Sequence, residues 1–205
     1  AELAALSVKL YGDISVEHRN VLKDLAFANL QLKRYNDVIQ EWHEVMRLGA
    51  KLSGDQNDLL VWGEKIAINL GDNNYKDVAI RMLDYCIRWR EKAGLMDEQY
   101  YYWSLRYARD YRHSIGKDDS LHIYFEKMAR VLPAKYSDAA FGLRDWASFT
   151  IGRKEYARFE PIERATQKYI NDKIQLGQRD AGYAEGLITL GRMSAVQGQT
   201  ERALK

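Results

Sequence analysis

Hydrophobic and polar positions follow the period of an amphipathic helix in one segment of the chain after another. In the stretch 22–29, apolar residues recur at steps of three and four, and a polar break follows at Lys33-Arg34. A second apolar series then begins, made of Tyr35, Val38, Ile39, Trp42, Val45 and Met46. This pattern predicts two amphipathic helices of about 14 residues each, joined by a tight turn.

A large apolar residue followed by a small one recurs along the chain at nearly constant spacing. The steps between successive pairs are 41, 41, 39 and 44 residues. The pairs are Leu25-Ala26, Ile66-Ala67, Tyr107-Ala108, Trp146-Ala147 and Leu190-Gly191. A small side chain lets two helices of a hairpin cross closely, so each pair marks an expected crossing point. A period near 40 residues indicates stacked helical hairpins rather than a single globular core.

These positions resemble the tetratricopeptide repeat (TPR), in its long-period variety of about 40 residues, as in kinesin light chains. The best-matching stretches are Leu25-Ala26…Tyr35…Val38…Trp42 and Leu190-Gly191…Gly198…Ala203. The resemblance implies an all-α fold, an α-α superhelix (solenoid) of antiparallel helix pairs. The chain departs from the family pattern at Gly63 and Ser104, which replace a bulky residue, and at Asn29 and Ser194, which replace an aromatic.

We expect a single helical-repeat domain over residues 1–205, a segment of or a region within a longer array. Its units are predicted at 1–14 (half a repeat), 16–52, 57–94, 97–133, 136–177 and 180–205 (partial). Pro161 is expected in the first turn of a helix over about 160–176. Leu3, Leu6 and Leu10 at one end, and Ala203 and Leu204 at the other, predict exposed apolar faces through which copies could associate end to end.

Composition narrows the function classes. Lys plus Arg number 31 and Asp plus Glu number 29, so the net charge is near zero and direct nucleic-acid binding is not expected. The single cysteine, Cys86, lies in an apolar helical pattern and predicts a buried thiol, which favours a reducing compartment such as the cytoplasm. No apolar run approaches the length of a membrane-spanning helix, so membrane insertion is not expected.

The chain offers no motif for chemistry. None of its four histidines has a second His or Cys at ligand spacing, and His43-Glu44 lacks the second His of a zinc helix. There is no Gly-rich phosphate loop and no nucleophile elbow. We therefore expect no enzyme activity, no catalytic residue, no metal site and no cofactor.

The strongest candidate site is a stripe on the first helix of the third unit. Three arginines lie beside a tyrosine on one helical face, formed by Tyr102, Leu105, Arg106, Arg109, Arg112 and His113. Guanidinium groups bind carboxylates in bidentate fashion, so the stripe suits an acidic peptide or a C-terminal carboxylate, with Tyr102 and Phe141 supplying apolar contact. The alternative is a solvated charged face with intrahelical pairs, for example to Asp110.

The TPR resemblance implies which further residues face the concave groove. They lie two positions before and after the large residue of each pair, or towards the helix end: Lys23, Phe27, Glu64, Ile68, Leu105, Arg109, Arg112, Arg144, Ile188 and Arg192. The groove would be basic in its middle. The run Arg88-Trp89-Arg90-Glu91-Lys92 is interpreted only as cations that suit a helix C-terminus.

The leading hypothesis is a scaffold for protein–protein interaction that binds a peptide or protein segment in this partly basic groove. Two alternatives stay open. The aromatic-rich units, notably Trp103…Tyr107…Phe125, also resemble half-a-TPR scaffolds of RNA processing. The array could instead be the sensor or regulatory region of a larger signalling or transcription-regulating protein.

Overall fold

The computed structural model describes residues 2–52, 56–96, 99–131 and 138–198. Every regular element in these ranges is helical. The chain divides into two compact units, Ala1–Leu95 (unit 1) and Met96–Lys205 (unit 2). The division falls between the second and third predicted repeats.

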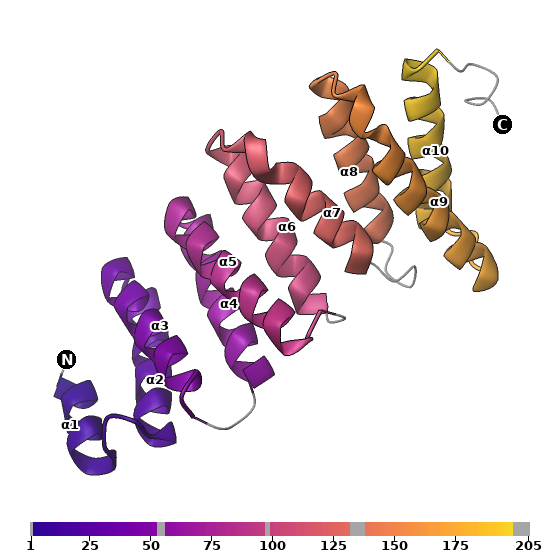
Figure 1. Ribbon diagram of the computed structural model, residues 1–205. Helices are drawn as coiled ribbons and strands as arrows, with labels where there is room; N and C mark the ends of the chain where they lie inside the picture. The colour runs from indigo at the N-terminus through magenta and orange to yellow at the C-terminus, as the bar shows by residue number, and fades with distance from the viewer. Residues whose placement is uncertain (1, 53–55, 97–98, 132–137, 199–205) are drawn as a thin grey trace. The chain divides into compact units, whose positions relative to one another are not determined.

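Unit 1 is a stack of antiparallel helix pairs (Figure 1). Its helices are α1 (Glu2–Tyr11), α2 (Val16–Gln31), α3 (Tyr35–Gly49), α4 (Gln56–Asp72) and α5 (Lys76–Ala93). Helix α2 packs along α3, and α4 packs along α5. Helix α1 lies against α2 without a preceding partner among the described residues, and its Leu3, Leu6 and Leu10 are 61%, 50% and 63% exposed, as predicted. Ala203 and Leu204, at the other predicted apolar end, lie outside the described residues.

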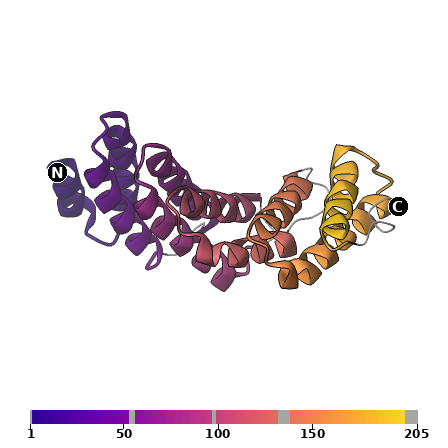
Figure 2. The same cartoon turned by 90° about the horizontal axis from the view of Figure 1, so that it is seen from above.

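Unit 2 repeats the arrangement. Its elements are α6 (Gln99–Ser114), the 3₁₀ turn η1 (Asp118–Ser120), α7 (Leu121–Val131), α8 (Asp138–Gly152), the 3₁₀ turn η2 (Tyr156–Arg158), α9 (Phe159–Gln175) and α10 (Ala181–Val196). Helix α6 pairs with α7, and α8 pairs with α9. Helix α10, drawn in yellow in Figure 2, packs against both α8 and α9. Pro161 lies in the first turn of α9, as predicted.

One turn joins the two helices in each of the four complete hairpins. The second residue after the end of the first helix adopts a left-handed conformation, at Lys33, Asn74, Gly116 and Lys154, with φ of 58°, 71°, 73° and 58°. The backbone N–H of the next residue donates back to a carbonyl five positions earlier, over 2.8–3.1 Å. This is the Schellman motif. In the fourth turn, Gly152 ends α8 and Lys154 takes the left-handed position.

The small residues of the pairs lie at helix contacts. Ala26, Ala67 and Ala108 are fully buried, and Ala147 is 3% exposed, as close helix crossings at these positions would require. Gly191 is only half-buried. The second helix expected beside it, at 200–205, falls outside the described residues. The large residues vary more, because Leu25 and Tyr107 are half-buried while Ile66 and Trp146 are buried.

Packing also explains the departure from the family pattern at Gly63. The indole Nε1 of Trp42 donates to the Gly63 carbonyl over 3.0 Å. A Cβ at position 63 would lie 3.0 Å from that Nε1 and 3.2 Å from Met46 Sδ. Glycine suits this position, because a methyl group there would require the Trp42 and Met46 side chains to shift by a few tenths of an ångström.

Cys86 is fully buried, as predicted. Burial is the main cause that raises the pKa of its thiol well above the ordinary value, and the neighbouring Glu64 carboxylate raises it further. A thiol held in its neutral form is a poor nucleophile, so Cys86 acts as a small apolar side chain of the core.

Candidate functional site

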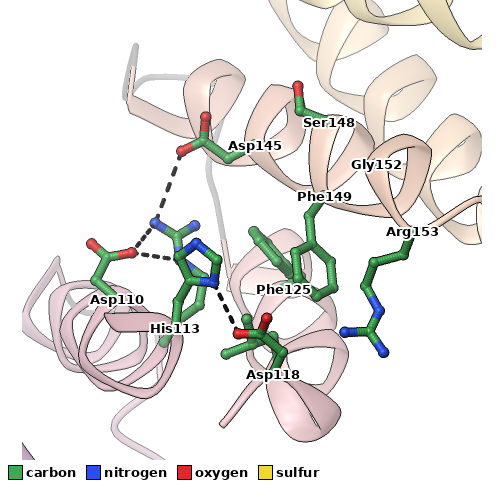
Figure 3. A pocket seen from close by; sticks show the side chains of 11 residues that line it. Asp110, His113, Asp118, Phe125, Asp145, Ser148, Phe149, Gly152 and Arg153 are labelled. Carbon is green, nitrogen blue, oxygen red and sulfur yellow. Dashed lines mark hydrogen bonds and ion pairs between the residues drawn. The ribbon is translucent and has the colours of Figure 1, made fainter. Parts of the chain in front are cut away.

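A cavity of unit 2 lies between α6 and α8, above α7 (Figure 3). Its volume is about 510 Å³. Leu121, Phe125 and Phe149 give it an apolar floor. Charged and polar groups form the rim: Arg109, Asp110, His113, Asp118, Asp145, Ser148, Gly152 and Arg153.

A smaller cavity of about 170 Å³ continues between the same two helices. It is lined by Tyr102, Arg106, Arg109, Phe141, Gly142, Arg144 and Asp145. The two cavities share Arg109 and Asp145, so they border each other. We call the pair of cavities the trough.

Arg109 is held firmly at the junction of the two cavities. Its Nε and Nη2 both donate to Asp110 Oδ1, over 2.8 and 2.6 Å, and its Nη2 lies 3.9 Å from Asp145 Oδ2. Its guanidinium carbon lies 4.8 Å from the centre of the Phe125 ring, within the range of a cation–π contact. The residue is 7% exposed. Arg109 is therefore a fixed and largely neutralised wall of the trough, not a free cation.

The more accessible arginines also have acidic neighbours. Arg106 Nε lies 3.9 Å from Asp110 Oδ2. Arg144 lies 3.1 Å from Asp145 and 3.7 Å from Glu185, and its guanidinium covers Phe141 at 5.0 Å. The groove was predicted to be basic in its middle, and this prediction is wrong for the trough. Aspartates on α6 and α8 balance the arginines there.

Side-chain contacts fix the far end of the trough. His113 Nδ1 lies 2.9 Å from Asp118 Oδ1. Arg153 Nε donates to Glu155 Oε1 over 2.8 Å, and this bond is the main cause that lowers the pKa of Glu155. Glu155 Oε2 also lies 2.6 Å from Nε2 of the buried His122. These contacts tie the turn between α8 and α9 to the first turn of α7.

The trough brings together six of the predicted site residues, drawn from α6 and α8: Tyr102, Arg106, Arg109, His113, Phe141 and Arg144. Arg112 lies elsewhere. Its Nε donates to the Tyr124 hydroxyl over 2.8 Å, and its guanidinium lies over the Tyr124 ring at 5.2 Å. Arg112 therefore joins α6 to α7.

Two residues predicted to face the groove are buried instead. Leu105 is 0% exposed and belongs to the core. Glu64 is 2% exposed because its carboxylate pairs with the fully buried Arg90. The rule carried over from the family fails at both positions.

The remaining predicted residues lie outside the trough. In unit 1, Lys23 and Phe27 of α2 both contact Trp62 of α4. The Lys23 Nζ lies 5.8 Å from the centre of the Trp62 ring, and the Phe27 and Trp62 ring centres are 6.4 Å apart. Ile68 is half-buried. In unit 2, Ile188 and Arg192 are exposed on α10.

Sequence reasoning missed Asp118, Asp145, Ser148 and Phe149 as lining residues. Three of the four flank the Trp146-Ala147 pair on α8. The helical period places Asp145, Ser148 and Phe149 on one face of α8, so the sequence does carry a signal for these three residues. Among the described residues, no group of three or more His, Cys, Asp or Glu side chains could hold a metal ion, and no helix is long and apolar enough to cross a membrane.

No family model matches the chain, and no curated protein is similar to it in sequence. Solved structures are similar in fold. One contains the nearly identical TPR-like repeats of a Podosopora anserina protein described as a kinesin light chain. It has a TM-score of 0.54 and 12% identity, over 90% of this chain and 89% of that one. Another is BtubC (BKLC) from P. vanneervenii, with a TM-score of 0.53 and 14% identity, over 99% of this chain and 82% of that one.

Likeness at this level of identity concerns the fold alone. The chain has an all-α, TPR-like helical-repeat fold, as its sequence pattern predicted.

Proposed function

We propose that the chain is a protein-interaction scaffold and that unit 2 binds a peptide segment in the trough between α6 and α8. The observation that carries the proposal is the trough itself. It combines an apolar floor with a charged rim on two adjacent first helices, and it gathers six residues that the sequence pattern had already selected.

The chemistry of the trough favours a peptide with an apolar anchor. Phe125, Phe149 and Leu121 offer a surface on which one aliphatic or aromatic side chain can be buried. Burying such a side chain contributes about 1.5–3 kcal/mol. Because Arg109 is already paired, the floor rather than net charge supplies most of the affinity.

The rim would orient the peptide backbone. The side chains of Asp110 and Asp145 are 46% and 42% exposed and can accept hydrogen bonds from backbone N–H groups. Those of Arg106 and Arg144 are 50% and 36% exposed and can donate to carbonyl oxygens or to an acidic side chain. A rim of alternating donors and acceptors suits an extended peptide.

A blocking variant tests the proposal. Ser148 is exposed and lines the larger cavity, so Ser148→Trp would fill it. Peptides are selected on the purified chain from a random library displayed on phage, and their Kd is measured by fluorescence anisotropy. We expect peptides with an apolar anchor to lose roughly tenfold or more in affinity for Ser148→Trp, since tenfold corresponds to about 1.4 kcal/mol.

The matched control is Ala184→Trp, which adds the same side chain at an exposed site on α10. It should bind the selected peptides as the unchanged chain does. If every selected peptide binds Ser148→Trp with unchanged Kd while circular dichroism confirms the fold, the trough is not the binding site.

A further inference from the structure

Unit 1 contains a second cavity that differs from the trough in its charge. It lies where the end of α3 and the start of α4 meet the last turns of α5, and its volume is about 480 Å³. Its lining is Ala50, Gln56, Tyr85, Arg88, Trp89, Lys92 and Ala93. None of these residues lines the trough, so the two sites can be tested separately.

The charged side chains of this cavity are both cations. Arg88 and Lys92 are exposed and lie four residues apart, on one face of α5. Within the part of the chain that the structure describes, no carboxylate lines the cavity and neither cation forms an ion pair. In the trough, by contrast, Arg109 shares its site with Asp110 and Asp145.

The other wall of the cavity is aromatic and fixed. Tyr85 and Trp89 meet edge to face, with ring centres 5.8 Å apart and an interplanar angle of 88°. The buried Trp42 packs against Tyr85 from the other side, with ring centres 5.6 Å apart. Both Tyr85 and Trp89 are half-buried, so each presents part of its surface to the cavity. Burial raises the pKa of the Tyr85 hydroxyl, and a tyrosine hydroxyl can donate a hydrogen bond.

We propose that this cavity binds an acidic protein segment, with carboxylates on Arg88 and Lys92 and an apolar side chain against Tyr85 and Trp89. Charge complementarity identifies the occupant, because two exposed cations with no carboxylate among the described lining residues attract carboxylates, and the fixed rings bury an apolar group with little loss of entropy. The acidic partner that the sequence suggested for the α6 stripe fits this cavity better. The site comes in addition to the trough and does not depend on it.

The probe is a fluorescein-labelled peptide of sequence Asp-Glu-Asp-Phe-Glu-Asp, measured by fluorescence anisotropy against the full chain. We expect saturable binding that weakens as salt is added, since exposed ion pairs are screened. A peptide with Lys in place of every acid should not bind, and a peptide with Ala in place of Phe should bind more weakly.

Variants locate the site. Arg88→Glu combined with Lys92→Glu should weaken binding of the acidic peptide by roughly tenfold or more, and Trp89→Ala by about fivefold. Arg81→Glu is the matched control, because Arg81 is exposed on the same helix and does not line the cavity. It should change the Kd by less than about twofold. The trough-blocking Ser148→Trp should leave the Kd unchanged.

Three results would overturn the proposal. One is the absence of saturable binding up to about 1 mM peptide, the weak limit of specific recognition. Another is an unchanged Kd for the double charge reversal with its fold intact by circular dichroism. The third is tighter binding of an eight-nucleotide oligouridine than of the acidic peptide, which would identify the aromatic and cationic wall as a site for single-stranded RNA.

Discussion

Each unit contains an arginine that is less than a tenth exposed, and the two arginines differ in what surrounds them. In unit 1, Arg90 is fully buried and forms a bidentate pair with Glu64, over 2.7 and 3.0 Å, while its Nη1 donates to Asn57 over 2.8 Å. In unit 2, Arg109 pairs with Asp110 and approaches Asp145, whose side chains are 46% and 42% exposed.

The difference concerns the solvation of the acidic partner. Glu64 has exchanged water for Arg90, so the two charges depend on each other and their role is to hold α4 against α5. Asp110 and Asp145 keep contact with water, so they can exchange it for a ligand. The paired arginine therefore stabilises the packing of α4 on α5 in unit 1, whereas in unit 2 it lies at a candidate binding surface.

Removal of the arginine gives the largest expected effect. Arg90→Met leaves the Glu64 carboxylate buried without its cation and should destabilise the chain by about 3–5 kcal/mol. Arg109→Met leaves solvated aspartates and should cost about 1 kcal/mol. Urea unfolding followed by circular dichroism measures both.

The double variant Glu64→Leu, Arg90→Met sharpens this comparison. It removes both charges and should recover most of the stability that Arg90→Met loses, since a buried ion pair and an apolar pair are often of similar stability. Equal costs for Arg90→Met and Arg109→Met would contradict the distinction between the two arginines.

Added methyl groups give the next largest effect. Gly63→Ala in unit 1 would force Trp42 and Met46 to move, because the new Cβ lies 3.0 and 3.2 Å from them, and should cost about 1–3 kcal/mol. Gly152→Ala in unit 2 meets nothing within 4 Å and should gain about 0.5 kcal/mol from helix propensity. Thermal unfolding of the two variants checks the opposite signs. Destabilisation by both would mean that the α8 terminus is more crowded than the structure indicates.

Much of this architecture was predictable from the sequence, because helices and their turns are local. The steps between large-small pairs fixed the hairpins, and the buried alanines at 26, 67 and 108 lie at crossings as expected. Ion pairs are not local. Glu64 and Arg90 are 26 positions apart, and no spacing rule says which two charges meet when helices pack. For the same reason, the sequence did not indicate that Asp145 lies beside Arg109 of α6.

For the candidate site, the sequence indicated the residues of one wall better than it indicated the charge of the trough. The helical face on α6 correctly brought Tyr102, Arg106 and Arg109 to one wall. The facing wall comes from α8, and its Asp145, together with Asp110 of α6, changes a basic stripe into a balanced trough. In the run Arg88-Trp89-Arg90-Glu91-Lys92, the interpretation as helix-end cations missed both the buried ion pair and the cationic cavity.

Two lysines in the hairpin turns allow a test in which the units should agree. Lys33 in unit 1 and Lys154 in unit 2 both have a φ of 58°, a conformation that favours glycine. Lys33→Gly and Lys154→Gly should each stabilise the chain by about 0.5–1 kcal/mol. Asn74→Gly is the control and should gain less, because asparagine tolerates this conformation. Thermal unfolding measures all three, and a loss of stability in either lysine variant would count against the shared turn.

The smallest expected effect is the change of stability with pH, which has opposite sign for one carboxyl group in each unit. In unit 1, burial is the main cause that raises the pKa of Glu41, although a hydrogen bond from Asn29, over 2.7 Å, opposes it. In unit 2, the hydrogen bond from Lys173, over 2.8 Å, is the main cause that lowers the pKa of Asp180, and the backbone N–H of Tyr183 helps.

The sign of each group's contribution to stability depends on whether the folded or the unfolded chain binds the proton more tightly. A raised pKa in the folded chain gives Glu41 a stabilising contribution below the ordinary glutamate pKa of about 4.3, and this contribution is lost as pH rises through the raised pKa. A lowered pKa gives Asp180 a stabilising contribution above the ordinary aspartate pKa of about 3.9, and this contribution is lost as pH falls through the lowered pKa. Glu41→Gln should therefore raise stability at pH 7 by roughly a few tenths of a kcal/mol, the small size reflecting solvent screening.

Urea unfolding across a pH series separates the two groups. For Glu41→Gln, the difference in stability from the unchanged chain should shrink as pH falls towards 4. Asp180→Asn retains an oxygen to accept the Tyr183 hydrogen bond but loses the charge opposite Lys173, so its deficit should be present at pH 7 and shrink in acid. If Glu41→Gln lowered stability at pH 7, the hydrogen bond from Asn29 would outweigh burial at this carboxylate, and unit 1 would respond to acid as unit 2 does.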